Sequence, residues 1–172
     1  MVIFYRNRKP PKPIKKEKFK MTEQAYNTRY LTVSEFQKLN NEKKLNVGMY
    51  YQRGHMVAWK KPERIDALID SILASWHIQP LHAREDENGI LELLDGKQRT
   101  NAIFTVLNGD YVPQLDELSV KGQTFPMWSQ DEKDAFYNYP LEIIIHNLDD
   151  TDILKYFGYL QKGIPLTPIP LN

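Results

Sequence analysis

The run of residues 95–100, Asp-Gly-Lys-Gln-Arg-Thr, combines residue types that can bind a phosphate group and act on it. It joins the apolar stretch 90–94 to apolar positions that repeat at helical spacing as far as Leu107. Because the glycine permits a tight turn, we expect a strand, a one-glycine turn and then a helix. A helix start attracts anions, and an arginine in the first turn can hold a phosphate through two hydrogen bonds. The pattern therefore predicts a phosphate site at this turn.

The same residues also have a purely structural interpretation. Asp95 would cap the helix, and Arg99 would be a solvated residue of its first turn. On spacing alone, we give this interpretation and the phosphate site about equal weight, because Asp-Gly before a helix is common chemistry.

The composition limits the class of protein. A chain of 172 residues can bury one sizeable core, and its ten Tyr, seven Phe and three Trp argue against general disorder. The absence of cysteine excludes disulfides, thiolate metal sites and a cysteine nucleophile. We find no apolar run of membrane-spanning length and no signal-peptide core, so we expect a cytoplasmic protein without a membrane partner.

Charge is distributed unevenly along the chain. Residues 1–20 hold eight Lys or Arg against one Glu, a net charge of +7, which leaves −6 for the rest because the whole chain carries +1. We interpret residues 1–25 as a flexible or tethering basic arm, which would either contact nucleic acid or only solubilise the protein. The candidate nucleic-acid contacts in this arm are Arg6, Arg8, Lys9, Lys12, Lys15 and Lys16.

Helices are predicted at four places besides the one after residue 96. Overlapping capping boxes at Thr32 and Ser34 predict a helix to about residue 40, and a third box at Ser129 predicts one to about residue 138. Pro62 opens the clearest amphipathic helix, whose apolar face runs on to Trp76. A last helix should start at residue 149 or 150.

Strands are predicted between these helices, at residues 45–51, 77–83, 90–94 and 141–145. Pro80 within the second of them indicates either an edge strand or an irregular start. Residues 86–89 resemble a hairpin turn. Strands and helices do not alternate strictly, so we expect an α+β fold, with a small mixed sheet flanked by helices in one domain over residues 26–172.

Other polar residues give weaker signals. The histidines are scattered, and His77 and His82 would face opposite sides of one strand, so they predict no metal site. Asp66 and Asp70 lie one helical turn apart, and we interpret them as part of a solvated helix face.

Three separated segments resemble the ParB/sulfiredoxin-like superfamily: Tyr51-Gln52-Arg53, the helical stretch 68–73 and Asp95 to Thr100. The most similar branch is the N-terminal domain of GmrSD-type, modification-dependent restriction systems and of SspE-like defence proteins. The resemblance runs from about Thr32 to the end of the chain. Such relatives usually continue into a helical region, so residues 26–172 are either part of a longer chain or a compact version of the domain.

The resemblance implies a domain that binds, and in an active member hydrolyses, a nucleoside triphosphate (ATP, GTP or CTP) with Mg²⁺. In multidomain relatives this activity controls a nuclease. Asp95 would hold Mg²⁺ through water or act as a base, and Gln98 would orient the attacking water. The implied phosphate-binding residues are Gly96, Lys97, Arg99, Thr100 and Arg53.

Two departures from the family pattern keep other functions open. Lys97 replaces a usual glutamine, and Tyr159 and Gln161 replace a usual arginine and asparagine, which puts hydrolysis in doubt. We favour an NTP-hydrolysing regulatory domain of a DNA restriction or phage–host defence or counter-defence system, in a bacterial host or phage-infected cell. The alternatives are a DNA-binding or DNA-cleaving ParB-like module, and a catalytically silent phage protein that acts on a host complex. The expected partners are a nucleotide, DNA through the arm, and a nuclease or host defence protein.

Overall fold

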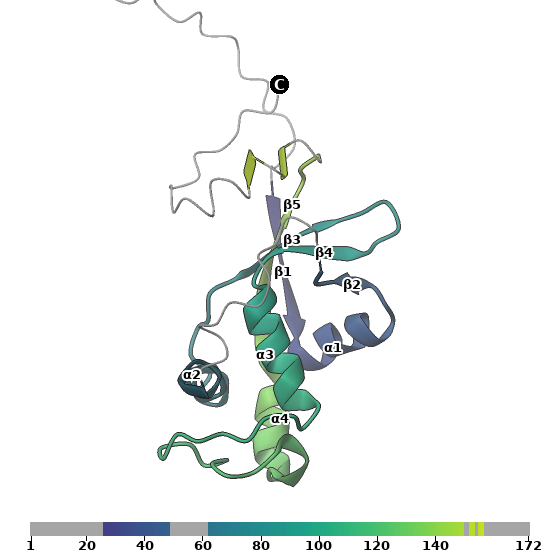
Figure 1. Ribbon diagram of the computed structural model, residues 1–172. Helices are drawn as coiled ribbons and strands as arrows, with labels where there is room; N and C mark the ends of the chain where they lie inside the picture. The colour runs from purple at the N-terminus through teal and green to yellow at the C-terminus, as the bar shows by residue number, and fades with distance from the viewer. Residues whose placement is uncertain (1–25, 49–61, 150–151, 154, 157–172) are drawn as a thin grey trace, which may run out of the picture.

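A five-stranded mixed sheet forms the centre of the molecule (Figure 1). The computed structural model describes residues 26–48, 62–149, 152–153 and 155–156. The strands of the sheet are β1 (Tyr26–Thr32), β2 (Leu45–Asn46), β3 (Leu81–Glu85), β4 (Leu91–Asp95) and β5 (Pro140–His146). The helices in the described ranges are α1 (Val33–Asn41), α2 (Pro62–Leu73), α3 (Lys97–Leu107) and α4 (Gln130–Asn138), with a 3-10 turn at Phe125–Met127. The predicted α+β class is confirmed.

The strands lie in the order β1-β5-β3-β4-β2. β5 pairs antiparallel with β1 and parallel with β3, and β4 pairs antiparallel with β3 and parallel with β2. The predicted hairpin turn joins β3 to β4. In that turn the Asp86 carboxylate accepts the N–H groups of Asn88 (2.9 Å) and Ile90 (2.8 Å), and Gly89 has a φ of 74°.

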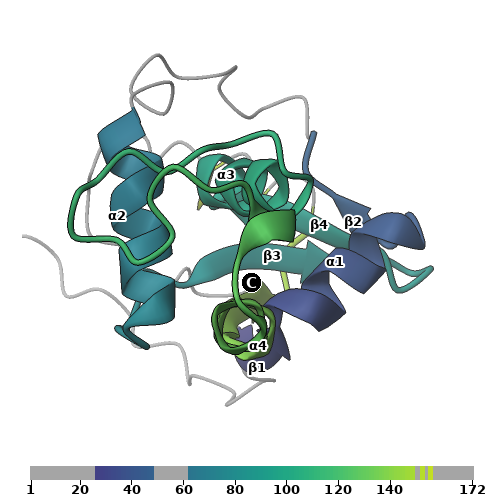
Figure 2. The same ribbon diagram turned by 90° about the horizontal axis from the view of Figure 1, so that it is seen from below.

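One face of the sheet carries the main core. Alternate strand residues point to this face, and all four helices pack their apolar residues against it. Figure 2 shows α2 and α1 on opposite sides of this layer, with α3 and α4 between them. A large aliphatic or aromatic side chain contributes about 1.5–3 kcal/mol to the stability of the fold when it is fully buried. The largest buried ones are Phe36, Ile69, Ile72, Leu81, Leu91, Leu93, Ile103, Phe136, Leu141 and Ile143.

The opposite face of the sheet is covered only in part by the described residues. Leu94 packs there with Ile153 and Tyr156 in a second, small apolar cluster. Residues 152–153 and 155–156 are helical, in agreement with the last predicted helix. This contact holds Tyr156 close to the end of β4, where the predicted site begins.

Local sequence signals predicted the helices well. The capping boxes at Thr32 and Ser129 are both formed and open α1 and α4, and Pro62 opens α2. The apolar face of α2 is shorter than predicted: the helix ends at Leu73, and Trp76, which was expected on that face, is 62% exposed.

The strand predictions needed more correction. β3 begins at Leu81, directly after Pro80, and not at residue 77. This agrees with the irregular strand start that Pro80 indicated. The alternative interpretation of Pro80, that this strand lies at the edge of the sheet, was wrong because β3 lies between β5 and β4. β1 was not predicted at all. Of the strand expected at 45–51, Leu45–Asn46 form β2, residues 47–48 are not part of a strand, and residues 49–51 lie outside the described residues.

Asp66 corrects another expectation. Its side chain is buried (2% exposed) rather than on a solvated helix face. One carboxylate oxygen accepts the hydroxyl of Tyr111 at 2.8 Å, and the other accepts the backbone N–H groups of Gln114 (3.0 Å) and Leu115 (2.8 Å). Asp66 therefore fastens the loop after α3 to α2, as a buried carboxylate must be fully paired.

Candidate functional site

The turn between β4 and α3 has the predicted strand–glycine–helix form. Gly96 is the N-cap of α3 and has a left-handed φ of 99°. A Cβ at this position would overlap Cδ2 of Leu81, so both the backbone angle and the space require glycine. α3 has no side-chain cap, which means that the alternative role of Asp95 as a helix cap is wrong. The N-terminal end of α3 keeps its partial positive charge without a capping side chain.

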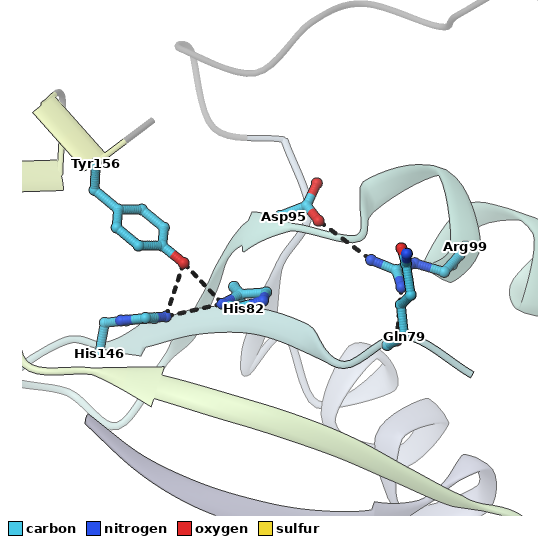
Figure 3. Close-up of polar contacts among 6 residues, drawn as sticks. All are labelled: Gln79, His82, Asp95, Arg99, His146 and Tyr156. Carbon is cyan, nitrogen blue, oxygen red and sulfur yellow. Dashed lines mark hydrogen bonds and ion pairs between the residues drawn. The ribbon is translucent and has the colours of Figure 1, made fainter. Parts of the chain in front are cut away.

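The carboxylate of Asp95 and the guanidinium of Arg99 lie together at this turn (Figure 3). Nη2 of Arg99 donates to Oδ2 of Asp95 at 3.2 Å, and Nη1 donates to the carbonyl oxygen of Gln79 at 2.6 Å. The Arg99 side chain is 11% exposed and that of Asp95 is 53% exposed. Burial lowers the pKa of Arg99 and Asp95 opposes that change, yet a guanidinium remains charged.

These contacts change the expected division of roles. Asp95 can reach a ligand from solvent, whereas two nitrogens of Arg99 already hold Asp95 and the segment before β3. Lys97 and Gln98 lie half-buried in the first turn of α3. Thr100 is fully buried and its Oγ1 has no hydrogen-bond partner in the described structure, so its side chain is not open to solvent at the helix start.

The remaining predicted residues lie outside the described residues. They are Arg53, the family positions Tyr159 and Gln161, and the arm residues Arg6, Arg8, Lys9, Lys12, Lys15 and Lys16.

A cluster of two histidines and a tyrosine lies beside the turn (Figure 3). Nδ1 of His82 and Nε2 of His146 are 2.9 Å apart, and the hydroxyl of Tyr156 lies 2.8 Å from the first and 3.1 Å from the second. The two imidazole rings are stacked, with an interplanar angle of 18°. His82 also lies opposite Asp95 in the pairing of β3 with β4. The cluster and the predicted site therefore share one end of the sheet.

Sequence reasoning missed this cluster. β3 and β5 are parallel, with His82 beside Ile144, so His146 projects from the same face two residues further along. The signal that was available is weak: His82 lies in the predicted strand 77–83, and His146 directly follows the predicted strand 141–145. The register of a parallel pair between distant segments cannot be read from a single sequence.

The environment disfavours the charged form of both imidazoles. Burial, with the neighbouring His82, lowers the pKa of His146 to about 4. Burial is also the main cause that lowers the pKa of His82, with Asp95 opposing it. Burial and Asp95 raise the pKa of the Tyr156 hydroxyl, which therefore keeps its proton.

The lowered pKa of His146 predicts a loss of stability in acid. Between pH 6.5 and 4 an unfolded chain takes up a proton at His146 that the folded protein does not, so the free energy of unfolding falls as pH falls. We expect this residue to contribute on the order of 1–2 kcal/mol to that fall, because the partly exposed ring keeps some hydration. Urea unfolding from pH 8 to 4 should show a shallower decline for His146→Gln. The prediction fails if the curves of the wild type and His146→Gln are parallel; His77→Gln, outside the cluster, is the control.

Comparison with known proteins identifies the family. The model of the family "GmrSD restriction endonuclease, N-terminal domain" matches residues 36–163, so the chain belongs to this family. The predicted resemblance to the N-terminal domain of GmrSD-type systems is thereby confirmed. No curated protein matches the chain.

A search of solved structures found a similar fold in the C-terminally truncated chromosome-partitioning protein ParB from Caulobacter crescentus, complexed with CTP-gamma-S. The identity is 13% and the TM-score 0.43, over 82% of this chain and 56% of the ParB chain. This chain thus spans little more than half the length of that protein. None of the helices in the described ranges is long and apolar enough to cross a membrane.

Proposed function

We propose that this domain binds a nucleoside triphosphate with Mg²⁺ at the turn between β4 and α3, and hydrolyses it. The proposal depends on one observation: an uncapped helix start lies directly beside an exposed carboxylate, with Arg99 3.2 Å from that carboxylate. Membership of the restriction-endonuclease family supports a regulatory role in a DNA restriction or phage defence system. The setting would be the cytoplasm of a bacterial host or a phage-infected cell.

The roles follow from charge and exposure. The N–H groups at the start of α3 and the ammonium of Lys97 would bind phosphate oxygens. Asp95 would hold Mg²⁺ through water or accept a proton from the attacking water, and Gln98 would orient that water. Arg53 would supply a further cation. This distribution provides the positioning and charge neutralisation that phosphoryl transfer requires.

Arg99 takes a different role from the one that its position in the motif implies. To grip a phosphate with both nitrogens it would have to release Asp95 and the carbonyl of Gln79. We therefore infer that Arg99 mainly holds Asp95 in place and keeps the turn against the segment before β3. Lys97, which replaces the usual glutamine of the family, then becomes the principal cation of the described part of the site.

Calorimetry with ATP, GTP and CTP in the presence of Mg²⁺ tests this function on the full chain. We expect one nucleotide to bind the wild type, and Lys97→Ala to lower its affinity by about 10-fold, the typical value of a hydrogen bond to a charged group. Asp95→Asn should retain binding and lose turnover by about 100-fold or more. Lys38→Ala, which removes an exposed lysine of α1, is the matched control.

Two results would refute the proposal: no binding of any of the three nucleotides, or unchanged turnover in Asp95→Asn. Binding that is weakened equally by Lys97→Ala and Lys38→Ala would move the nucleotide away from this turn.

The basic arm favours DNA binding as a second candidate function. Its net charge of +7 over residues 1–20 would release counterions from DNA, so the affinity should fall steeply with salt and vanish when residues 1–20 are deleted. If neither nucleotide nor DNA binds and a stable complex with a defined host protein forms, the domain is a catalytically silent interaction protein. The replacements Tyr159 and Gln161 are the sequence features that favour this last outcome.

A further inference from the structure

Two large aromatic side chains of β1 are exposed on the face of the sheet that points away from the main core. Tyr26 is 50% exposed and Tyr30 is 63% exposed. In the pairing of β1 with β5, Tyr26 lies opposite His146 and Tyr30 lies opposite Glu142. Residues directly opposite each other in an antiparallel pair share a face, so both tyrosines lie on the side that carries His146 (Figure 3). β1 therefore presents two aromatic rings to solvent.

The two rings belong to a polar row along β1. Side chains alternate across a strand, so Tyr26, Thr28 and Tyr30 follow one another on this face, with about 13 Å between the two tyrosines. Thr28 is exposed between them. The ring of Tyr26 packs at a tilt against His146, with ring centroids 6.2 Å apart, which supports it from one side. Because this row contains no aliphatic side chain, it suits a ligand of flat rings joined by polar groups better than an apolar partner.

The charge of the chain next to this row favours an anionic ligand. Residues 1–20 carry a net charge of +7, and only five residues separate them from Tyr26. Five residues bridge roughly 20 Å at full extension, so the last lysines before them can reach anions bound close to β1. The acidic residue opposite Tyr30 is Glu142, whose side chain is 24% exposed and whose Oε2 lies 3.1 Å from Nε2 of His77. A polyanion that also offers flat rings fits both features.

We propose that Tyr26 and Tyr30 stack on the bases of a single-stranded nucleic acid whose phosphates bind the basic residues of the arm. A single strand exposes the flat faces of its bases, and a base of any kind can stack on an aromatic side chain. A duplex hides those faces between its base pairs, so it would contact the charges of the arm alone. The two tyrosines therefore select single strands over duplexes, without reading a sequence.

This inference rests on the DNA-binding candidate function and makes its partner more specific. It is independent of the nucleotide proposed at the turn between β4 and α3. In the described sheet, β1 lies at the edge, and β5 and β3 separate it from β4. A nucleotide at the turn and a nucleic-acid strand on β1 would therefore bind at different places, and Lys97→Ala should leave the binding of the strand unchanged.

Fluorescence anisotropy of the full chain with labelled oligothymidylate, and with a duplex of the same length, tests the proposal. We expect the wild type to bind the single strand more tightly than the duplex. Tyr26→Ala and Tyr30→Ala should each weaken binding of the single strand about 5-fold or more, the typical effect of losing one base stack. Their affinity for the duplex should not change. Tyr26→Phe and Tyr30→Phe keep the ring and should bind the single strand nearly as the wild type does.

Two further variants separate stacking from charge. Met127→Ala removes another exposed side chain (65% exposed), in the 3-10 turn, and should bind both nucleic acids as the wild type does. A full-length variant with Lys12→Gln, Lys15→Gln and Lys16→Gln should bind both more weakly. Its slope of log affinity against log salt for the single strand should be smaller by about 2, because each lost phosphate contact contributes about 0.7. Melting temperatures close to that of the wild type would show that the variants keep the fold.

The proposal is overturned if the single strand binds no more tightly than the duplex, or if both alanine variants of the tyrosines bind it as tightly as Met127→Ala does. Duplex binding that still depends on the arm lysines would then leave the general DNA-binding function intact. Absence of all nucleic-acid binding would remove both. Binding to vesicles of anionic phospholipid in place of the single strand would overturn the proposal in favour of a membrane surface.

Discussion

Replacing Gly96 with alanine is expected to lower the free energy of unfolding by about 2–5 kcal/mol. Two costs add at this position. The left-handed φ of 99° is unfavourable for a residue with a Cβ, by about 1–2 kcal/mol. The new Cβ would also overlap Leu81, a fully buried core residue, and overpacking of this kind costs about 1–3 kcal/mol. The effect is large because the whole free energy of unfolding of such a domain is about 5–15 kcal/mol.

Gly122 provides a matched control for this prediction. It has a similar left-handed φ of 74°, but a Cβ there meets no atom within 4 Å. Gly122→Ala should therefore show only the backbone cost of about 1–2 kcal/mol. Urea unfolding of the two variants separates the two terms. Equal losses in both would mean that Leu81 moves aside freely and that the turn does not require the close approach of β3.

The residues around Gly96 illustrate what sequence patterns can predict. A glycine between an apolar run and helical spacing was enough to predict the turn, and this turn brings the side chains of Asp95 and Arg99 together. Capping boxes and Pro62 likewise located three helix starts, because each signal acts within one turn of its own helix. Turns and helix starts can therefore be predicted from sequence, because the residues that determine them are close together in the chain.

What the sequence did not reveal depends on contacts between distant segments. Arg99 donates a hydrogen bond to the carbonyl oxygen of Gln79, 20 residues earlier in the chain. His82 and His146 are hydrogen-bonded although 64 residues separate them. β1 was missed because its partner in the described part of the sheet is β5, more than 100 residues later in the chain. Parallel and long-range pairings leave no periodic signal in either partner, so they could not be predicted.

The contrast between Asp95 and Asp66 makes the same point with two carboxylates. A motif pointed to Asp95, and the structure leaves its side chain exposed to solvent. Asp66 carries no motif and lies beside an apolar helix face, where a solvated position was expected. Its burial depends on three donors that the loop after α3 supplies, which no helical pattern could indicate.

Replacing Asp66 with alanine is accordingly expected to destabilise the domain by about 3–5 kcal/mol. The change would leave two buried backbone N–H groups, of Gln114 and Leu115, without an acceptor, while the hydroxyl of Tyr111 would keep the carbonyl oxygen of Pro62 at 3.0 Å. A buried donor without a partner costs about 1–3 kcal/mol, and water that enters the loop would recover part of that cost. The free energy of urea unfolding at pH 7 measures the loss.

Three companion variants show whether the carboxylate contacts cause this loss. Asp66→Asn keeps one acceptor oxygen for the two backbone N–H groups, and Tyr111 can then accept from the amide, so it should cost less than Asp66→Ala. Tyr111→Phe removes one hydroxyl, which lies within hydrogen-bond distance of both Asp66 and the carbonyl of Pro62, and should cost about 1 kcal/mol. Asp70→Ala, one turn along α2 and only half-buried, should stay within about 0.5 kcal/mol of the wild type. If Asp70→Ala destabilised the domain as much as Asp66→Ala, the loss would come from α2 itself, and the loop would not depend on Asp66 for its position.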